Sequence, residues 1–321
     1  MRPDPTASVF LADGPADPPG ASASAVAARD VDLVVNANAT GAGSTADVVA
    51  RATDALERAG AHVRAHVTGT EAELAAVAAT AAARRLVLVG GDGTVHALAN
   101  VDLPTLPATA LLPAGRANNI ARALGIPVDW GAAAQLAVHG RPAAVDALRV
   151  ETPQRTLYAV EGVSAGFHAA ARHRYTATNS GDLAAGVRAL VAELATFRPH
   201  RVALDVDGAT AFDGTAAQVF LSNLPYFGFG FHVDPAADPS DGRLEAIVLE
   251  GTTRRDVVRL LAAARDGRHL GRPGVTLTRA TEARTERPLP LVADAVPLGV
   301  TTAVVTVAPG RLTLVVPEPR S

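Results

Sequence analysis

A glycine-rich turn after an apolar run carries the clearest chemical signal in the sequence. Residues 86–100 read LVLVGGDGTVHALAN, which predicts a buried strand that ends in GGDGT and runs directly into a helix. The N–H groups at such a helix start attract phosphate, and glycines let the backbone approach an anion closely. Thr94 can donate a hydroxyl group, and Asp92 can hold a metal or a ribose. A plain strand-to-helix turn capped by Asp92 is the alternative.

A second candidate is His168, in the segment EGVSAGFHAAA. An imidazole titrates near neutral pH and can act as a general acid or base. The alternative is a polar residue with satisfied hydrogen bonds at a turn. Glu161, just upstream, is costly to bury unless it is paired, and His168 or Arg116 would be a suitable partner.

Two further clusters have both a functional and a structural interpretation. An aromatic cluster can form an apolar pocket wall for an acyl-like chain, or it can pack in the core. An arginine cluster on a predicted helix can meet anionic lipid headgroups, or it can form a solvated face. The aromatic cluster is Tyr226, Phe227, Phe229 and Phe231, and the arginine cluster is Arg254, Arg255 and Arg259.

The elements that must position these residues alternate between strand and helix in the first part of the chain. Strands are predicted at residues 31–36, 61–70, 86–90 and 109–113, with helices from Thr45 to Gly60, at 71–85, at 93–100 and around 118–124. Thr45 is expected to cap the first of these helices. The alternation predicts a doubly wound parallel sheet in an α/β domain.

After Pro142 the chain changes to short β-branched segments, interrupted by helical patterns at 182–197 and 254–265. This pattern of short β-branched segments predicts an antiparallel, β-rich, sandwich-like second domain. The predicted organisation is a flexible leader at 1–30, an α/β domain at 31–142 that carries the predicted phosphate-binding turn, and a β-rich domain at 143–321.

Composition excludes several classes of chemistry. The 321 residues have a net charge of −3, which argues against nucleic acid as a partner. Cysteine is absent, and all 29 basic residues are Arg, so thiolate, Schiff-base and lysine phosphate-loop chemistry are ruled out. No apolar run reaches the length of about 20 residues that a membrane span needs. We therefore expect a soluble, cytoplasmic protein.

Taken in order, the motifs resemble the catalytic domain of the diacylglycerol kinase family, which includes bacterial lipid kinases and sphingosine kinases. The resemblance rests on N-x-x-A-T at Asn36 to Thr40, on GGDGT, on LLPAGRANNIARALGIP and on AVDALRV. It continues through NLPYFGFGF, ADPSDGRLEAIVL, LVADAVPLG and TVAPGRLTLVVP, and so covers residues 31 to 317. It implies an α/β nucleotide domain, a β-rich domain and an active site in the cleft between them.

This resemblance implies transfer of the γ-phosphoryl group of ATP to a lipid hydroxyl, with Mg²⁺. The residues implied to contact the nucleotide are Asn36, Thr40, Thr68, Gly91, Asp92, Gly93, Thr94, Gly115, Arg116 and Asn118. A metal site maps to the PSDGRL loop, with Asp241 as the side-chain ligand and Asp238 and Arg243 contributing main-chain oxygen. An ordinary hairpin turn at Asp241 is the alternative. Asp92, Asp294 and His168 are the candidate catalytic residues.

Three positions depart from the family pattern. The hydroxyl residue expected after Gly115 is Arg116, which can pair with a phosphate or fill the phosphate space, and Asn119 closes the same motif. The family's acidic proton acceptor near the C-terminus is replaced by Val296, which leaves Asp294 as a candidate base. His168 stands where relatives generally have Asp.

Three functions therefore remain open. The first is a lipid kinase that phosphorylates a diacylglycerol-, sphingoid- or isoprenoid-like alcohol, with transient membrane contact. The second is an enzyme redirected to non-kinase chemistry through Arg116, His168 and Glu161. The third is a catalytically inactive nucleotide- or lipid-binding protein. A homodimer is compatible with each of them.

Overall fold

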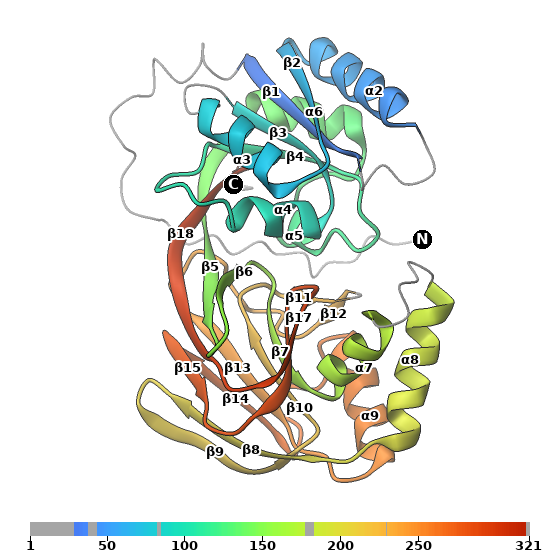
Figure 1. Ribbon diagram of the computed structural model, residues 1–321, viewed down its shortest axis with the longest axis vertical. Coiled ribbons are helices and arrows are strands. Elements are labelled where there is room, and N and C mark those ends of the chain that lie inside the picture. The colour runs from blue at the N-terminus through green and yellow to red at the C-terminus, as the bar shows by residue number, and fades with distance from the viewer. Residues whose placement is uncertain (1–28, 38–43, 82–84, 177–182, 229, 319–321) are drawn as a thin grey trace. The chain divides into compact units, whose positions relative to one another are not determined.

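The computed structural model describes residues 29–37, 44–81, 85–176, 183–228 and 230–318, which divide into two compact units (Figure 1). The first unit runs to Val145 and includes the chain again from Pro309 onward, and the second is Asp146–Ala308. The sequence placed residues 143–321 in one domain, whereas the segment from Pro309 returns to the first unit. Thr40, Phe229 and the leader up to residue 28 lie outside the described residues.

The first unit is built on a parallel sheet, as predicted. Its order is β2 (His62–Thr68), β1 (Asp30–Asn36), β3 (Arg85–Gly90) and β4 (Thr109–Pro113), followed by the end of β18 (Val304–Val316). Each neighbouring pair is parallel. The carboxyl ends of β1 to β4 therefore share one edge, where the predicted phosphate-binding turns begin.

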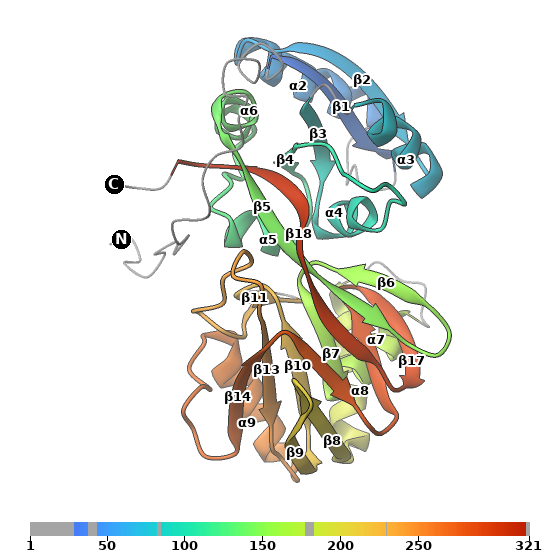
Figure 2. The ribbon, with the colours of Figure 1, turned by 90° about the vertical axis from the view of Figure 1, so that its left-hand side faces the viewer.

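Helices cover both faces of this sheet (Figure 2). They are α2 (Thr45–Arg58), α3 (Glu71–Thr80), α4 (Asp92–Ala99), α5 (Asn119–Ala123) and α6 (Trp130–His139). Helices α2 and α6 share a buried apolar core with alternate residues of the strands, and Leu56 of α2 and Leu33 of β1 are among its members. The expectation that Thr45 caps α2 is wrong, because the cap is Ser44, whose Oγ accepts a hydrogen bond from Asp47 N at 3.1 Å.

The second unit contains a six-stranded antiparallel sheet, and its β-rich character confirms the prediction. The order is β14 (Val275–Ala280), β13 (Leu244–Leu249), β10 (Gln218–Ser222), β7 (Gly162–Gly166), β16 (Leu289–Ala293) and β17 (Val296–Thr301). A second layer holds β5 (Arg141–Glu151), β6 (Thr156–Ala159), β8 (His200–Val206), β9 (Ala209–Ala216), β15 (Glu282–Thr285) and the start of β18. Apolar side chains from both layers, such as Leu221 and Leu204, form the core between them.

Three helices pack on the other face of the six-stranded sheet: α7 (Phe167–Thr176), α8 (Leu183–Thr196) and α9 (Arg254–Arg265) (Figure 1). Phe167 and Val257 join α7 and α9 in one buried cluster. A short hairpin, β11 (Tyr226–Phe227) with β12 (Phe231–His232), completes the unit. Among the described helices, none combines the length and the hydropathy that crossing a bilayer requires.

Arg311 anchors β18 within the first unit. Its guanidinium donates to the carbonyl oxygens of Ala99 at 3.0 Å, Val101 at 2.7 Å and Leu103 at 3.1 Å, which are the last residue of α4 and two residues just beyond it. A planar guanidinium can satisfy several carbonyls at once because its N–H donors are fixed in a fork. One side chain therefore holds the end of α4 against the last strand.

We expect Arg311→Ala to lower the free energy of unfolding of the first unit by about 2–4 kcal/mol, since three charge-assisted hydrogen bonds are lost. Urea denaturation followed by the fluorescence of Trp130, the chain's single tryptophan, measures this. Arg311→Lys keeps the positive charge but loses the planar guanidinium, so its urea midpoint should fall between those of the parent and of Arg311→Ala. An unchanged midpoint for Arg311→Ala would show that β18 is held by its backbone alone.

Candidate functional site

Two turns touch at the carboxyl ends of the neighbouring strands β3 and β4. Ala114 N donates to the Gly90 carbonyl oxygen at 2.8 Å, so the strand pairing continues into the turns. A β-carbon on Gly91 would lie 2.7 Å from the Gly115 α-carbon, and one on Gly115 would lie 2.6 Å from the Gly91 α-carbon. Glycine is therefore required at both positions, because any other residue would force the turns apart.

Side chains from each turn lock this arrangement. Asn118, in the left-handed region with φ of 50°, accepts from Gly115 N at 2.9 Å through Oδ1 and donates to the Gly115 carbonyl oxygen at 2.8 Å through Nδ2. Asp92 Oδ1 accepts from Ile120 N at 3.0 Å, in the first turn of α5. One oxygen of Asp92 thus holds the GGDGT turn to the next helix, and a catalytic role for Asp92 stays a prediction.

The start of α4 fits a phosphate group. Gly91 is the N-cap residue of α4, and because glycine has no side chain, the N-cap position makes no side-chain hydrogen bond to the first turn. Gly93 is exposed, and a β-carbon there would meet no atom within 4 Å. Thr94 is buried against Gly90. Open space beside a helix start with glycine at its N-cap is what an approaching anion requires.

The other predicted nucleotide residues lie at or near the same edge of the first unit. Asn36 ends β1 and pairs in register with Thr68, the last residue of β2, which is buried. Arg116 is exposed on the turn after β4. The Arg116 side chain does not lie between the turns after β3 and β4, because the backbones of Gly91 and Gly115 are in direct contact there.

In the second unit, Asp294 holds the chain where it enters β7. Its Oδ2 accepts from Val160 N at 2.8 Å, and its Oδ1 accepts from Glu161 N at 2.8 Å and from Gly162 N at 3.0 Å. Asp294 itself has φ of 49°, a left-handed conformation that Asp tolerates. Three hydrogen bonds to backbone N–H groups give this carboxylate a structural role, and its assignment as proton acceptor stays a prediction.

His168 lies near the start of α7 and not at a turn, and buried polar groups fix its ring. Its Nδ1 is 2.9 Å from Ser164 Oγ, and its backbone N–H donates to Gln218 Oε1 at 2.8 Å. Gln218 Nε2 donates to the Val219 carbonyl oxygen at 2.7 Å and to Ser164 Oγ at 2.9 Å. Ser164 and Gln218 were not singled out from the sequence, although polar residues inside apolar strand patterns are a signal for such networks.

The expectation that His168 titrates near neutral pH is wrong. Burial, and to a lesser extent the positive charge of Arg172, lowers the pKa of His168 to about 4. At that pKa the imidazole is neutral at pH 7. Glu161, on the same stretch of chain, accepts a hydrogen bond from Gly228 N at 3.0 Å through Oε2.

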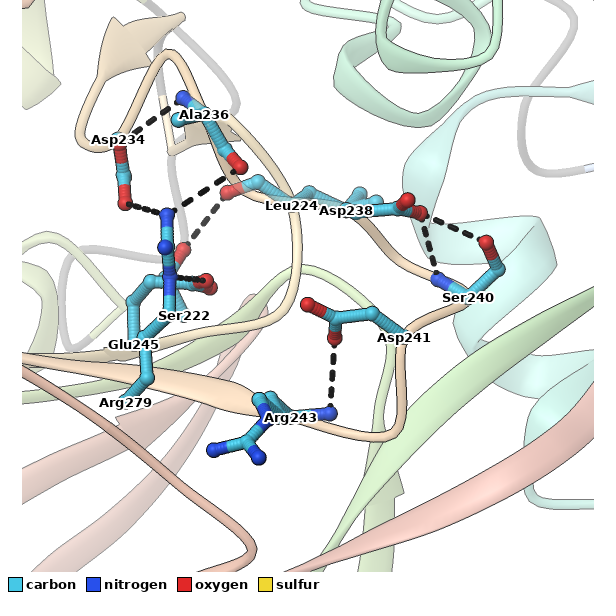
Figure 3. A network of polar contacts seen from close by, with 10 residues as sticks. All are labelled: Ser222, Leu224, Asp234, Ala236, Asp238, Ser240, Asp241, Arg243, Glu245 and Arg279. Atoms are coloured by element: carbon cyan, nitrogen blue, oxygen red, sulfur yellow. Dashed lines mark hydrogen bonds and ion pairs between the residues drawn. The ribbon is translucent and has the colours of Figure 1, made fainter. Parts of the chain in front are cut away.

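The predicted metal loop is well ordered by its own side chains (Figure 3). Asp238 Oδ1 accepts from Ser240 N at 3.0 Å, and Asp241 Oδ1 accepts from Arg243 N at 2.9 Å. Buried Asp146, on β5, accepts a hydrogen bond from Gly242 N at 2.8 Å and so ties the loop to that strand. Asp241 is exposed, and one carboxylate with main-chain oxygens is a donor set that suits a hard cation. No group of three or more His, Asp or Glu side chains that could hold a metal ion occurs in the described part of the chain.

Beside this loop lies a buried acidic pair that sequence reasoning did not find (Figure 3). Glu245 and Asp234 are both buried, and Arg279 approaches Glu245 at 3.3 Å and Asp234 at 3.6 Å. Burial, helped by the nearby charges of Asp234 and Asp241, raises the pKa of Glu245 to about 8 despite Arg279. At neutral pH, Glu245 is thus mostly protonated, which removes one negative charge from the neighbourhood of the loop.

The remaining candidates are placed as follows. Phe227 is buried and packs on Phe220 with ring centroids 5.6 Å apart, so this member of the aromatic cluster packs in the core. Tyr226 stacks on His232 at 4.5 Å. The cluster Arg254, Arg255 and Arg259 is exposed on α9.

Comparison with known proteins agrees with this architecture. Residues 30–150 match the diacylglycerol kinase catalytic domain, and residues 161–316 match the YegS C-terminal NAD kinase beta sandwich-like domain. The chain therefore belongs to the family of diacylglycerol kinases and YegS-like lipid kinases.

Individual relatives support the same assignment. A diacylglycerol kinase of Mycobacterium tuberculosis is 28% identical over 218 residues, which are 63% of this chain and 67% of that protein. A diacylglycerol kinase of Bacillus subtilis is 26% identical over 246 residues, or 71% of this chain and 77% of that protein. The crystal structure of a diacylglycerol kinase from Bacillus anthracis shares the fold with a TM-score of 0.65 at 20% identity, covering 90% of this chain and 97% of that one.

We expect Gly91→Ala to destabilise the first unit by about 1–3 kcal/mol, because its β-carbon would force the contact with Gly115 to open. Gly93→Ala is the matched control on the same helix, where the added methyl group meets open space and stability should be unchanged or slightly higher. Urea midpoints from Trp130 fluorescence compare the two variants. Equal midpoints would contradict the tight contact between the turns.

Asp294→Asn should destabilise the second unit by about 2–4 kcal/mol, because the amide brings an NH₂ group against backbone donors that the carboxylate satisfied. Asn tolerates the left-handed conformation as well as Asp does, so the hydrogen bonds alone are tested. Urea denaturation followed by circular dichroism measures the loss. The control is Asp213→Asn, at an exposed carboxylate on β9, which should shift stability by less than about 0.5 kcal/mol. If Asp294→Asn were as stable as the parent, the structural role assigned to the Asp294 carboxylate would be contradicted.

Proposed function

We propose that the chain transfers the γ-phosphoryl group of ATP to a hydroxyl group of a hydrophobic acceptor. The observation that carries this proposal is the helix start of α4 with glycine at its N-cap and open space at Gly93, set in a chain of the lipid kinase family. Phosphoryl transfer depends mainly on positioning and charge stabilisation, which backbone N–H groups supply. The turns after β3 and β4 hold these groups rigidly because of the contact between Gly91 and Gly115.

Each group of residues has a defined task in this proposal. N–H groups of the GGDGT turn bind phosphate oxygens, and Arg116, exposed on the adjacent turn, adds positive charge where the chain has no lysine. Asp241, with main-chain oxygens of Asp238 and Arg243, would hold Mg²⁺, which when bound offsets negative charge. His168 remains neutral at pH 7, so it can donate a hydrogen bond but is a weak base.

Binding and turnover are tested separately. Mg-ATP at millimolar concentration should raise the melting temperature by mass action, since it binds the native state. Gly93→Ala should weaken this binding about tenfold without loss of stability, because its methyl group occupies the space for the phosphate. Calorimetric titration of both proteins gives the two dissociation constants.

Transfer of ³²P from labelled ATP to diacylglycerol, a sphingoid base and an isoprenoid alcohol then identifies the acceptor class. The proposal fails if Mg-ATP causes no thermal shift, or if Gly93→Ala binds ATP as tightly as the parent. Binding of ATP without transfer to any acceptor would indicate a nucleotide-binding protein that has lost catalysis.

A further inference from the structure

The oxygens that would hold a cation in the second unit come from both ends of one stretch of loop. The loop joins β12 to β13 at residues 233–243, and the proposed ligands are the main-chain oxygens of Asp238 and Arg243 with the Asp241 carboxylate. Two of these three ligands are backbone atoms, so a change of side-chain rotamer cannot adjust their spacing. Cation affinity at such a site depends on the contacts that fix the loop backbone.

Arg279, on β14, reaches both flanks of this loop (Figure 3). On the flank before the ligands, its Nη2 lies 3.6 Å from Asp234 Oδ2 and donates to the Ala236 carbonyl oxygen at 3.5 Å. On the flank after the ligands, its Nε donates to Glu245 Oε1 at 3.3 Å, and these two residues are cross-strand partners in the pairing of β13 with β14. One planar guanidinium therefore bridges the two flanks of the ligand-bearing stretch.

Both carboxylates in these contacts are buried, so they depend on the positive charge of Arg279. Asp234 and Glu245 are each 1% exposed. Asp234 Oδ1 accepts from Ala236 N at 2.9 Å, whereas its Oδ2 makes no hydrogen bond within the described residues. His269 is buried nearby, but burial lowers its pKa, so it is mainly uncharged at pH 7 and does not replace Arg279. Loss of the cation beside a buried carboxylate is strongly unfavourable.

Asp146 holds the middle of the same loop. Its backbone N–H donates to the Pro239 carbonyl oxygen at 2.7 Å, and its carboxylate accepts from Gly242 N at 2.8 Å. The centre of the loop is thus tied to β5 by backbone and side chain together. A change at Arg279 therefore acts on the flanks of the loop and leaves its central anchor in place.

We propose that Arg279 is a positioning residue for the cation site. By holding the two flanks of the loop together through Asp234 and Glu245, its guanidinium sets the spacing of the two main-chain ligand oxygens without touching the cation. The inference rests on the proposed function, which places Mg²⁺ in this loop. It adds a residue on a neighbouring strand that controls how tightly the cation is bound.

The sign of the effect separates positioning from simple electrostatics. Removal of Arg279 makes the surroundings of the site more negative, which by itself would strengthen the binding of a divalent cation. Loss of the correct oxygen spacing weakens that binding instead. A variant without the arginine charge therefore gives opposite results under the two explanations.

Mn²⁺ binding to the full chain without nucleotide tests the proposal, with the electron paramagnetic resonance signal of free Mn²⁺ as the readout and displacement by Mg²⁺ as the check. Arg279→Met should weaken Mn²⁺ binding about tenfold, as expected for a residue that supports metal ligands. Arg279→Lys keeps the charge but loses the planar fork, so its affinity should lie between those of the parent and of Arg279→Met. Asp241→Asn should weaken binding as well, which locates the measured ion in this loop.

Arg284→Met is the matched control. Arg284, on β15 in the same unit, also lies between two carboxylates, with Glu282 and Glu286 each 3.6 Å away. Its side chain is 50% exposed, against 44% for Arg279, but its two partners are exposed and not buried. We expect Arg284→Met to bind Mn²⁺ as the parent does.

Each outcome decides for or against the proposal. Tighter Mn²⁺ binding in Arg279→Met would indicate electrostatics alone, and a lower melting temperature with unchanged Mn²⁺ affinity would indicate a merely structural ion pair. Either result overturns the proposal, as does a parent chain that binds no Mn²⁺. If Arg279→Met does not fold, Arg279→Lys carries the test, because it conserves the net charge and its weaker binding would come from geometry.

The proposed function fails or stands on different measurements. A parent that transfers phosphate to an acceptor, but whose Arg279 variants bind Mn²⁺ as tightly as Arg284→Met, refutes the positioning role alone. A parent that loses Mn²⁺ affinity in Arg279→Met but binds no ATP supports the positioning role and refutes phosphoryl transfer.

Discussion

The contact between Gly91 and Gly115 is the constraint on which the first unit's site depends. Two strand ends approach so closely that neither backbone can carry a β-carbon, and Asn118 and Asp92 then fasten the turns from either side. The distance between the turns is thus set by backbone atoms and not by adaptable side chains. The two turns are rigid before any ligand arrives, which would lower the entropy that the proposed binding of a phosphate must offset.

In the second unit, buried polar groups fix the positions of backbone and side chains. Asp294 organises three successive N–H groups at the entry to β7, and β7 carries Ser164, which in turn orients His168. Both residues that the sequence offered as acid or base are therefore committed to hydrogen bonds within the unit. In the proposed phosphoryl transfer, the chain would position its reactants and would not supply a strong base, which suits a reaction that depends mainly on positioning and charge stabilisation.

Prediction from sequence succeeded where the signal was local. The GGDGT turn joins a strand to the next helix within a few residues, so its type and position follow from the apolar pattern alone. Helices α6 and α7 were not predicted, because WGAAAQLAVH is rich in alanine and FHAAARHRYT is largely small or polar, so neither shows a clear apolar stripe. Their helical state depends on packing against strands β4 and β7, which the local pattern does not contain.

The polar networks were missed for a related reason, which also bears on the altered family positions. Asp294 reaches N–H groups 132 to 134 residues away, and Gln218 reaches Ser164 across 54 residues. A substitution judged by its own chemistry is then misread: His168 considered alone is a titratable base, but with Ser164 and Gln218 it is a neutral residue held by buried hydrogen bonds. At this position the departure from the family pattern replaces a carboxylate, which accepts hydrogen bonds, with a neutral imidazole, so its effect depends on the buried residues that surround it and not on the side chain alone.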